Sequence, residues 1–205
     1  MASLLFAGVV APLAGFVVLA LFGARLGKPR AGYLACASVG ISTVLATAVL
    51  VRWLAGDGHA EQPWVFHWAT IGNVTVNFSV NLDSLTVIMY FMVSFVSFWI
   101  FVFSLGYMAG HSDEIDGQSK YHRFFTYLCL FDFSMLGLVI APSLLFLFIF
   151  WELVGLCSYL LIGFYFHKKS ASDAAIKAFV VNLSLIHISE PTRPLYISYA
   201  VFCLK

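Results

Sequence analysis

Long apolar runs constrain the fold of this 205-residue chain more than any other feature. Five runs are long enough to cross a bilayer, and they cover approximately residues 3–23, 32–54, 84–108, 124–141 and 143–166. A sixth run begins near Ala174. About 20 apolar residues in a helix match the hydrocarbon core of a membrane, and a helix satisfies its own backbone hydrogen bonds there. We therefore predict an all-α fold, a polytopic transmembrane helical bundle of about six spans.

The composition supports a membrane protein and excludes several other classes. Hydrophobic residues make up 61% of the chain and charged residues 10%, whereas soluble domains carry about 25% charged residues. The formal net charge of +1 gives no reason to expect a nucleic-acid partner, so the lipid bilayer is the expected surrounding. The cysteines and histidines lack the spacing of a disulfide framework or a metal site. No glycine-rich phosphate loop or nicotinamide fingerprint occurs, so we assign no catalytic, cofactor-binding or metal-binding residues.

The positive charges of the expected loops predict the orientation of the chain. Lysine and arginine concentrate in the first, third and fifth loops, as Arg25, Lys28, Arg30, Lys120, Arg123, Lys168 and Lys169. Cytoplasmic loops are enriched in these residues, so the odd loops should be cytoplasmic and the N-terminus periplasmic, in a bacterial inner membrane. Positive residues follow the first run instead of preceding it, which indicates a retained span and not a secretory signal.

The second loop, residues 55–83, contains a strand pattern. Apolar residues alternate with polar ones from Val74 to Val80, and Gly72 and Asn73 just before them suggest a turn. Alternation with a period of two is typical of a half-buried strand. We predict a small extracytoplasmic β-hairpin that caps the outer face.

The character of the sequence changes near its end. Residues 183–194 include Pro191 and Pro194 where the sixth span should continue, and proline breaks a helix. One explanation is a span that ends early before a polar segment. The same twelve residues, however, match one translation of a transposase-type sequencing adapter. We interpret residues 1–182 as one transmembrane part and residues 183–205 as a sequencing artefact that forms no domain, and genomic DNA read across codon 183 tests this.

The most informative single residue is Glu152, which interrupts the fifth run. Apart from cysteine and tyrosine, it is the only ionisable residue from Ser143 to Phe164. It lies roughly 14 Å along the helix, near the bilayer midplane. A carboxyl at that depth is costly and usually marks an ion or proton path, so we interpret Glu152 as a proton-translocating group. The alternative is an acid that only holds helices together through a hydrogen bond.

Two other charged residues could act with Glu152 in proton translocation. Lys177, near the start of the sixth span, could be the cation that biases the protonation of Glu152, or it could extend to the membrane surface as lysines commonly do. Asp132 is as deep in the fourth span, and the near absence of a turn at Pro142 makes that span pair with the fifth. Asp132 could therefore couple to Glu152 directly or through water. The alternative is a neutral Asp132 bonded to a hydroxyl such as that of Ser134 or Ser158.

Several segments resemble one family of membrane subunits. The longest is Trp-Glu-Leu-Val-Gly-Leu-Cys-Ser-Tyr-Leu-Leu-Ile-Gly-Phe at residues 151–164, preceded by Tyr-His-Arg-Phe-Phe-Thr-Tyr-Leu at 121–128. Residues 81–85 and 174–182 continue the match. The chain resembles the antiporter-like subunit L, or chain 5, of proton-pumping NADH–quinone oxidoreductase (respiratory complex I), over residues 1–182.

The resemblance implies a share in proton translocation driven by quinone reduction elsewhere in the complex. Glu152 matches the key acid of the family's fifth span, which pairs with a lysine of a seventh span that this sequence does not reach. The resemblance also implies that this chain holds no cofactor, because NAD, FMN, iron–sulfur clusters and quinone would belong to partner subunits. The expected partners are the other membrane subunits of complex I. Asp132 is not carried over from the family and rests on its depth alone.

Two alternative functions remain open at the level of sequence. A large subunit of a multisubunit cation/proton antiporter, or of a membrane-bound hydrogenase, would be built on the same kind of span. Neighbouring genes for peripheral redox subunits would favour complex I, and a cluster of small antiporter subunits would favour the antiporter. From a different class, the spans could be purely structural, with Glu152 a packing acid.

Overall fold

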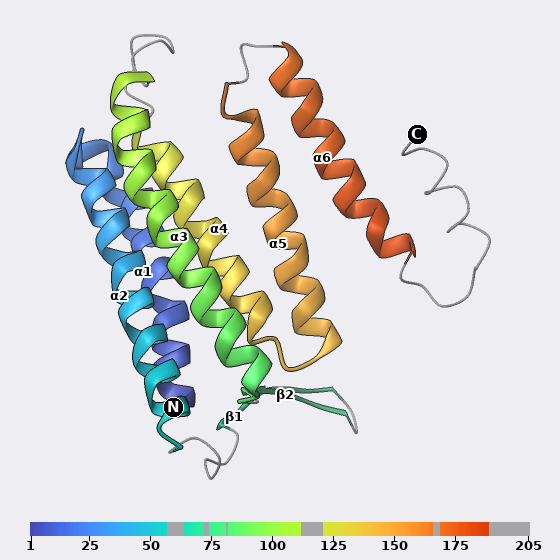
Figure 1. Ribbon diagram of the computed structural model, residues 1–205. Coiled ribbons are helices and arrows are strands. Elements are labelled where there is room, and N and C mark those ends of the chain that lie inside the picture. The colour runs from blue at the N-terminus through green and yellow to red at the C-terminus, as the bar shows by residue number, and fades with distance from the viewer. Residues whose placement is uncertain (57–63, 72–73, 81, 112–120, 166–168, 189–205) are drawn as a thin grey trace. The chain divides into compact units, whose positions relative to one another are not determined.

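The computed structural model describes residues 1–56, 64–71, 74–80, 82–111, 121–165 and 169–188. Within these residues the chain forms six long helices, a two-stranded sheet and one short 3-10 helix (Figure 1). Their bounds are α1 Ala2–Leu26, α2 Arg30–Leu54, β1 Trp64–Ile71, β2 Val74–Val80, α3 Ser84–His111, α4 Tyr121–Val139, α5 Leu144–Ile162, η2 Gly163–Tyr165 and α6 Lys169–Ile188. Each expected apolar run therefore forms a helix, and α6 begins five residues before Ala174.

The chain divides into two compact units, residues 1–154 and 155–205. The first contains α1 to α4, the hairpin and the first half of α5, and the second contains the rest of α5, η2 and α6. We describe each unit by itself. The predicted boundary after residue 182 stays a prediction.

Helices α1 to α4 form an antiparallel bundle in the first unit. At one end, Gly23 of α1 lies against His122 of α4, and Gly32 of α2 lies against Tyr121. At the other end, one apolar core brings together the start of α1, the end of α2, the start of α3 and the end of α4, through Leu5, Val49, Val87, Leu136 and Ile140. This up-and-down order follows from helices of similar length joined in sequence.

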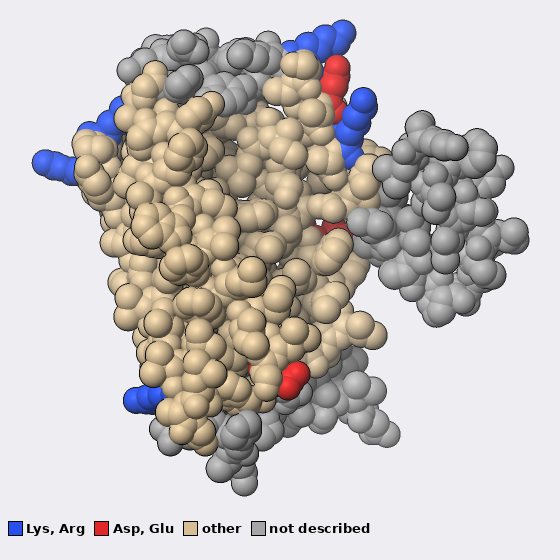
Figure 2. Space-filling view, viewed as in Figure 1, with Lys and Arg blue, Asp and Glu red and all other residues tan. Residues whose placement is uncertain are grey.

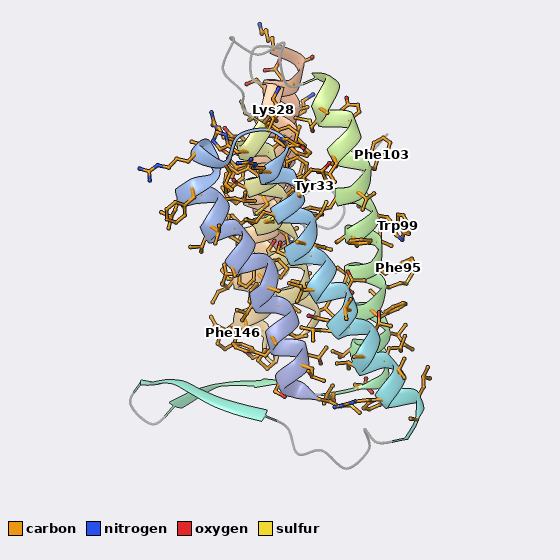
Figure 3. The ribbon with its side chains drawn as sticks, turned by 90° about the vertical axis from the view of Figure 1, so that its left-hand side faces the viewer. Lys28, Tyr33, Phe95, Trp99, Phe103 and Phe146 are labelled. Atoms are coloured by element: carbon orange, nitrogen blue, oxygen red, sulfur yellow. The ribbon has the colours of Figure 1, made fainter. Side chains whose placement is uncertain are left out.

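The third helix has a buried face and an exposed face. Its buried residues recur at steps of three, four or seven positions, as Val87, Tyr90, Ser94, Phe101, Ser104 and Met108. Such spacing places side chains along one stripe of a helix. On the opposite face, Phe95, Trp99 and Phe103 point away from the bundle (Figure 3), with the Phe95 and Trp99 ring centroids 6.3 Å apart. The carboxylate of Asp83 accepts a hydrogen bond from the backbone N–H of Ser84 at 2.8 Å, at the start of this helix.

The two strands form an antiparallel pair between α2 and α3. Trp64 pairs with Val80 and Ile71 with Val74, with an irregularity between His67 and Ala69. The position of this pair corresponds to the hairpin expected around residues 72–80. Its location on the outer side of the membrane stays a prediction.

Small residues bring α5 and α6 close together in the second unit. A side chain at Gly155 would crowd the Asn182 amide, whose nitrogen would lie 2.9 Å from the added Cβ, and one at Gly163 would meet Ala175 at 3.4 Å. The rings of Tyr159 and Phe179 pack beside them at 5.6 Å. Small residues at helix contacts are typical of membrane bundles, because they let backbones approach.

Four of the described helices are long and apolar enough to cross a membrane: residues Ser3–Leu26, Arg30–Leu54, Ser84–Gly110 and Leu144–Ile162. Figure 2 shows that uncharged residues cover most of this face, interrupted by acidic atoms near its middle, with lysine and arginine toward its margins. The chain is therefore a multi-pass membrane protein. Helices α4 and α6 do not meet the same length and apolarity, so the fourth and sixth spans stay predictions.

Candidate functional site

Glu152 lies near the middle of α5, eight residues after its start and ten before its end. The side chain is half-buried, and its Oε1 atom is enclosed without a hydrogen-bond partner among the described residues. One carboxyl oxygen is thus screened from its surroundings, while the rest of the side chain remains accessible.

The first half of α5 is fixed on α4 by one aromatic side chain. The ring of Phe150, two residues before Glu152, packs edge-to-face on Phe133 with centroids 5.8 Å apart. Gly137 of α4 leaves room for the same ring, because any side chain there would collide with it. Only four residues join α4 to α5. The predicted contact of the fourth and fifth runs is therefore confirmed at Phe150, and the pairing of Glu152 with α4 stays a prediction.

Asp132 lies on α4 and is more deeply buried than Glu152. It is 1% exposed, and neither carboxyl oxygen has a hydrogen-bond partner in the described part of the chain. The Ser97 hydroxyl of α3 interacts with this carboxyl without reaching the geometry of a hydrogen bond. Asp132 therefore faces the interior of the α1–α4 bundle.

The structure corrects two details predicted for Asp132. No direct hydrogen bond joins it to Glu152, so only a coupling through water stays a prediction. Ser134 is not its partner either, because the Ser134 hydroxyl donates to the Phe131 carbonyl at 2.7 Å. Serine in a helix commonly bonds a carbonyl of the preceding turn, and sequence spacing alone does not reveal that choice.

Lys177 lies on α6, in the second unit. Its side chain is exposed there. Its predicted pairing with Glu152 stays a prediction.

Sequence analysis missed three hydroxyl groups in the bundle. The Tyr90 hydroxyl of α3 donates to the Leu5 carbonyl at 3.1 Å, and Ser42 of α2 lies beside it with no partner for its own oxygen among the described residues. Ser97 is the third. The spacing of Tyr90, Ser94 and Ser97, four and then three residues apart, is a signal that predicts one polar stripe on α3.

Comparison with known proteins identifies the family. Residues 68–125 match the family described as NADH-ubiquinone oxidoreductase (complex I), chain 5 N-terminus, and residues 141–185 match NADH:quinone oxidoreductase/Mrp antiporter, TM. NADH-quinone oxidoreductase subunit L of Neisseria meningitidis is 39% identical over 171 residues, which are 83% of this chain and 24% of that protein. The chain belongs to the complex I chain 5 family.

Other members of the chain 5 family give the same result. NAD(P)H-quinone oxidoreductase subunit 5 of Paulinella chromatophora is 44% identical over 158 residues, 77% of this chain and 22% of that protein. Subunit L of Pseudomonas aeruginosa is 38% identical over 173 residues, 83% of this chain and 27% of that protein. The chain spans about a quarter of the length of these relatives.

The two family matches cover some of the candidate residues and not others. Glu152 and Lys177 fall within the match at residues 141–185, whereas Asp132 falls between the two matched segments. Membership of the chain 5 family therefore bears on Glu152 and Lys177. The case for Asp132 depends on its surroundings in this molecule.

Proposed function

We propose that this chain is a membrane subunit of proton-pumping NADH–quinone oxidoreductase and takes part in proton translocation coupled to quinone reduction. The observation that carries the proposal is Glu152: a half-buried carboxyl, with one enclosed and unpaired oxygen, in the middle of an apolar helix. Its position within the family match at residues 141–185 supports the assignment to complex I.

The chemistry of the proposal is the binding and release of one proton at the Glu152 carboxyl. An ionised carboxylate that leaves water loses several kcal/mol of solvation, and a nearby cation offsets part of that loss. Movement of a positive charge toward or away from Glu152 therefore drives release or uptake of its proton. We propose Lys177 as this cation and Asp132 as a second proton-carrying group.

The charged residues of the α1–α4 bundle support an orientation. Arg25, Lys28 and Arg30 lie at the connection of α1 and α2, and Arg123 lies in the first turn of α4 at the same end of the bundle. Positive residues mark the cytoplasmic side. We therefore propose an inner-membrane location with this end cytoplasmic and the N-terminus periplasmic.

The proposed partners are the other membrane subunits of complex I. The oxidation of NADH and the reduction of quinone, with FMN and iron–sulfur clusters, are assigned to partner subunits. The described residues contribute helices and proton-carrying side chains, and we assign them no redox centre.

Substitution of Glu152 in the full-length chain of the host tests the proposal. In membrane vesicles supplied with NADH, Glu152→Gln should lower proton uptake by roughly tenfold or more, since a positioned proton-transfer group contributes at least that much. The amount of assembled complex should stay normal. Phe148→Leu, an exposed apolar position on the same helix, is the matched control and should pump normally. Unchanged proton uptake in Glu152→Gln would refute the proposal.

A second candidate function is a large subunit of a cation/proton antiporter or of a membrane-bound hydrogenase. The family description at residues 141–185 includes the Mrp antiporter and so favours the first of these as the nearer relative. Vesicles given a sodium gradient without NADH distinguish the functions. Proton exchange under those conditions supports the antiporter, and proton uptake that requires NADH and quinone supports complex I.

A further inference from the structure

We propose that Asp132, Ser97, Tyr90 and Ser42 form one proton-binding site inside the α1–α4 bundle, in which buried water links the carboxyl to the hydroxyls. Its share in translocation rests on the proposed function. The site itself is argued from the first unit alone.

The buried carboxyl of Asp132 requires hydrogen-bond partners. It is almost fully buried, and neither of its oxygens is paired with a described residue. A buried polar group without a partner costs about 1–3 kcal/mol, and an ionised one costs more. Buried water commonly satisfies such groups when two to four polar atoms surround it. Asp132 is therefore expected to hold a proton and to share it with water.

Three hydroxyls from two other helices supply the remaining polar atoms. The Ser97 hydroxyl of α3 interacts with the Asp132 carboxyl. Tyr90, two turns earlier on α3, lies beside Ser42 of α2, because a side chain at Gly8 would meet both hydroxyls. Ser42 is fully buried, and its oxygen has no partner among the described residues. The site thus contains two enclosed side chains, Asp132 and Ser42, that still require hydrogen bonds.

Tyr90 gives the site a direction. Its single hydroxyl proton is donated to the Leu5 carbonyl, so toward its other neighbours the oxygen is only an acceptor. A water that donates to Tyr90 can accept from Asp132. In that arrangement the neutral Asp132 carboxyl donates its proton in a hydrogen bond to the water. Gly8 of α1 makes room for the Tyr90 hydroxyl, because a side chain at Gly8 would collide with it.

Ser97 lies at the edge of the site. It is half-buried, and it also lines an open, apolar groove between α3 and α4, whose other walls are Met89, Met92, Val93, Val96, Ile100, Phe131 and Met135. In the neutral form the Asp132 carboxyl donates its proton in a hydrogen bond to the linking water and accepts a hydrogen bond from the Ser97 hydroxyl. Ser97 is therefore the residue that positions the Asp132 carboxyl.

Infrared spectroscopy of the assembled complex containing the full chain tests the site. A neutral carboxylic acid gives a carbonyl band that is distinct from the backbone bands and sensitive to hydrogen bonding. The band of Asp132 should be lost in Asp132→Asn, should shift in Ser97→Ala and Tyr90→Phe, and should return to its original position in Ser97→Thr. Ser134→Ala is the matched control, since its buried hydroxyl bonds only its own helix at 2.7 Å, and should leave the band unchanged.

The outcomes separate this inference from the proposed function. The proposed site is refuted if Asp132→Asn leaves the infrared spectrum unchanged. It is also refuted if neither Ser97→Ala nor Tyr90→Phe shifts the carbonyl band. The serine and tyrosine variants keep the Asp132 carboxyl, so the position of its band can be measured in them even if Asp132→Asn fails to assemble. If Glu152→Gln pumps normally while the band behaves as expected, the proposed function fails and the site stands.

Discussion

Helices α4 and α5 follow each other along the chain, yet α4 buries polar as well as apolar side chains and α5 leaves most of its large side chains exposed. The polar residues Asp132, Ser134 and Thr126 of α4 are all buried. The more apolar α5 leaves most of its large side chains exposed, including Leu144 at 84% and Phe148 at 44%. The two acids differ in the same way, with Asp132 enclosed and Glu152 half-buried.

The lipid surroundings explain this contrast between the two helices. In water an apolar helix is driven inward, but lipid is as apolar as leucine, so apolarity does not decide which helix is central. Polar and small groups are kept inside because they are costly against lipid. The helix with more polar residues therefore becomes the core, and the apolar helix presents its carboxyl at the edge of that core.

Truncation of an aromatic residue on each helix should give the largest difference. Phe125 of α4 is fully buried and packs on Tyr121 at 4.9 Å between ring centroids, so Phe125→Ala should lower the free energy of unfolding by about 3–5 kcal/mol. Phe148→Ala of α5 should cost less than about 1 kcal/mol, because the ring is partly exposed. Thermal unfolding in detergent measures both. Equal losses would contradict the division into core and edge.

Substitution of a glycine at the contact of the two helices should have the next largest effect. Gly137→Ala places a methyl group in the Phe150 ring and should cost about 1–3 kcal/mol by overpacking. Gly106 of α3 has open space around it, so Gly106→Ala should stabilise by about 0.5 kcal/mol or be neutral. The same unfolding measurement applies. A harmless Gly137→Ala would mean that Phe150 does not fix α5 on α4.

Replacement of each acid by leucine sharpens the comparison of the two carboxyls. Asp132→Leu removes the carboxyl that shares buried water with its hydroxyl neighbours in the proposed site, and it should destabilise by about 1–3 kcal/mol. Glu152→Leu should change stability by less than about 0.5 kcal/mol, because the position is half-buried on an apolar helix. The amount of assembled complex on a native gel is the measurement. A severe assembly defect in Glu152→Leu would favour the packing-acid alternative.

The smallest effect expected is that of one buried hydroxyl. Tyr90→Phe removes the hydrogen bond to the Leu5 carbonyl and should cost about 1 kcal/mol. Tyr159→Phe, on the exposed side of α5, should cost almost nothing. If both substitutions are equally mild, the Tyr90 hydroxyl does not contribute to the stability of the bundle.

The sequence predicted the helices well because their length is set by the membrane. The α4–α5 hairpin was also predictable, since Pro142 leaves no room for a longer connection. What apolar length does not predict is which faces meet. Ser97 of α3 approaches Asp132 in place of the expected Ser134, because helix packing, and not spacing along one helix, brings those two groups together.

The candidate site was predictable only in part. Glu152 stands out because it is the single acid of its run, and its half-buried position agrees with a functional carboxyl. Ser42 and Tyr90 carry no such signal, since hydroxyls occur throughout apolar spans and acquire meaning only through their neighbours on other helices. The role of Lys177 stays a prediction.

The number of protons translocated per NADH oxidised tests the central claim, that the Glu152 carboxyl carries protons. The measurement compares Glu152→Gln with Glu152→Asp in vesicles that contain equal amounts of assembled complex. The account predicts a lower ratio in Glu152→Gln and recovery of most of the wild-type ratio in Glu152→Asp, because only the latter restores an ionisable group. A wild-type ratio in Glu152→Gln would contradict it.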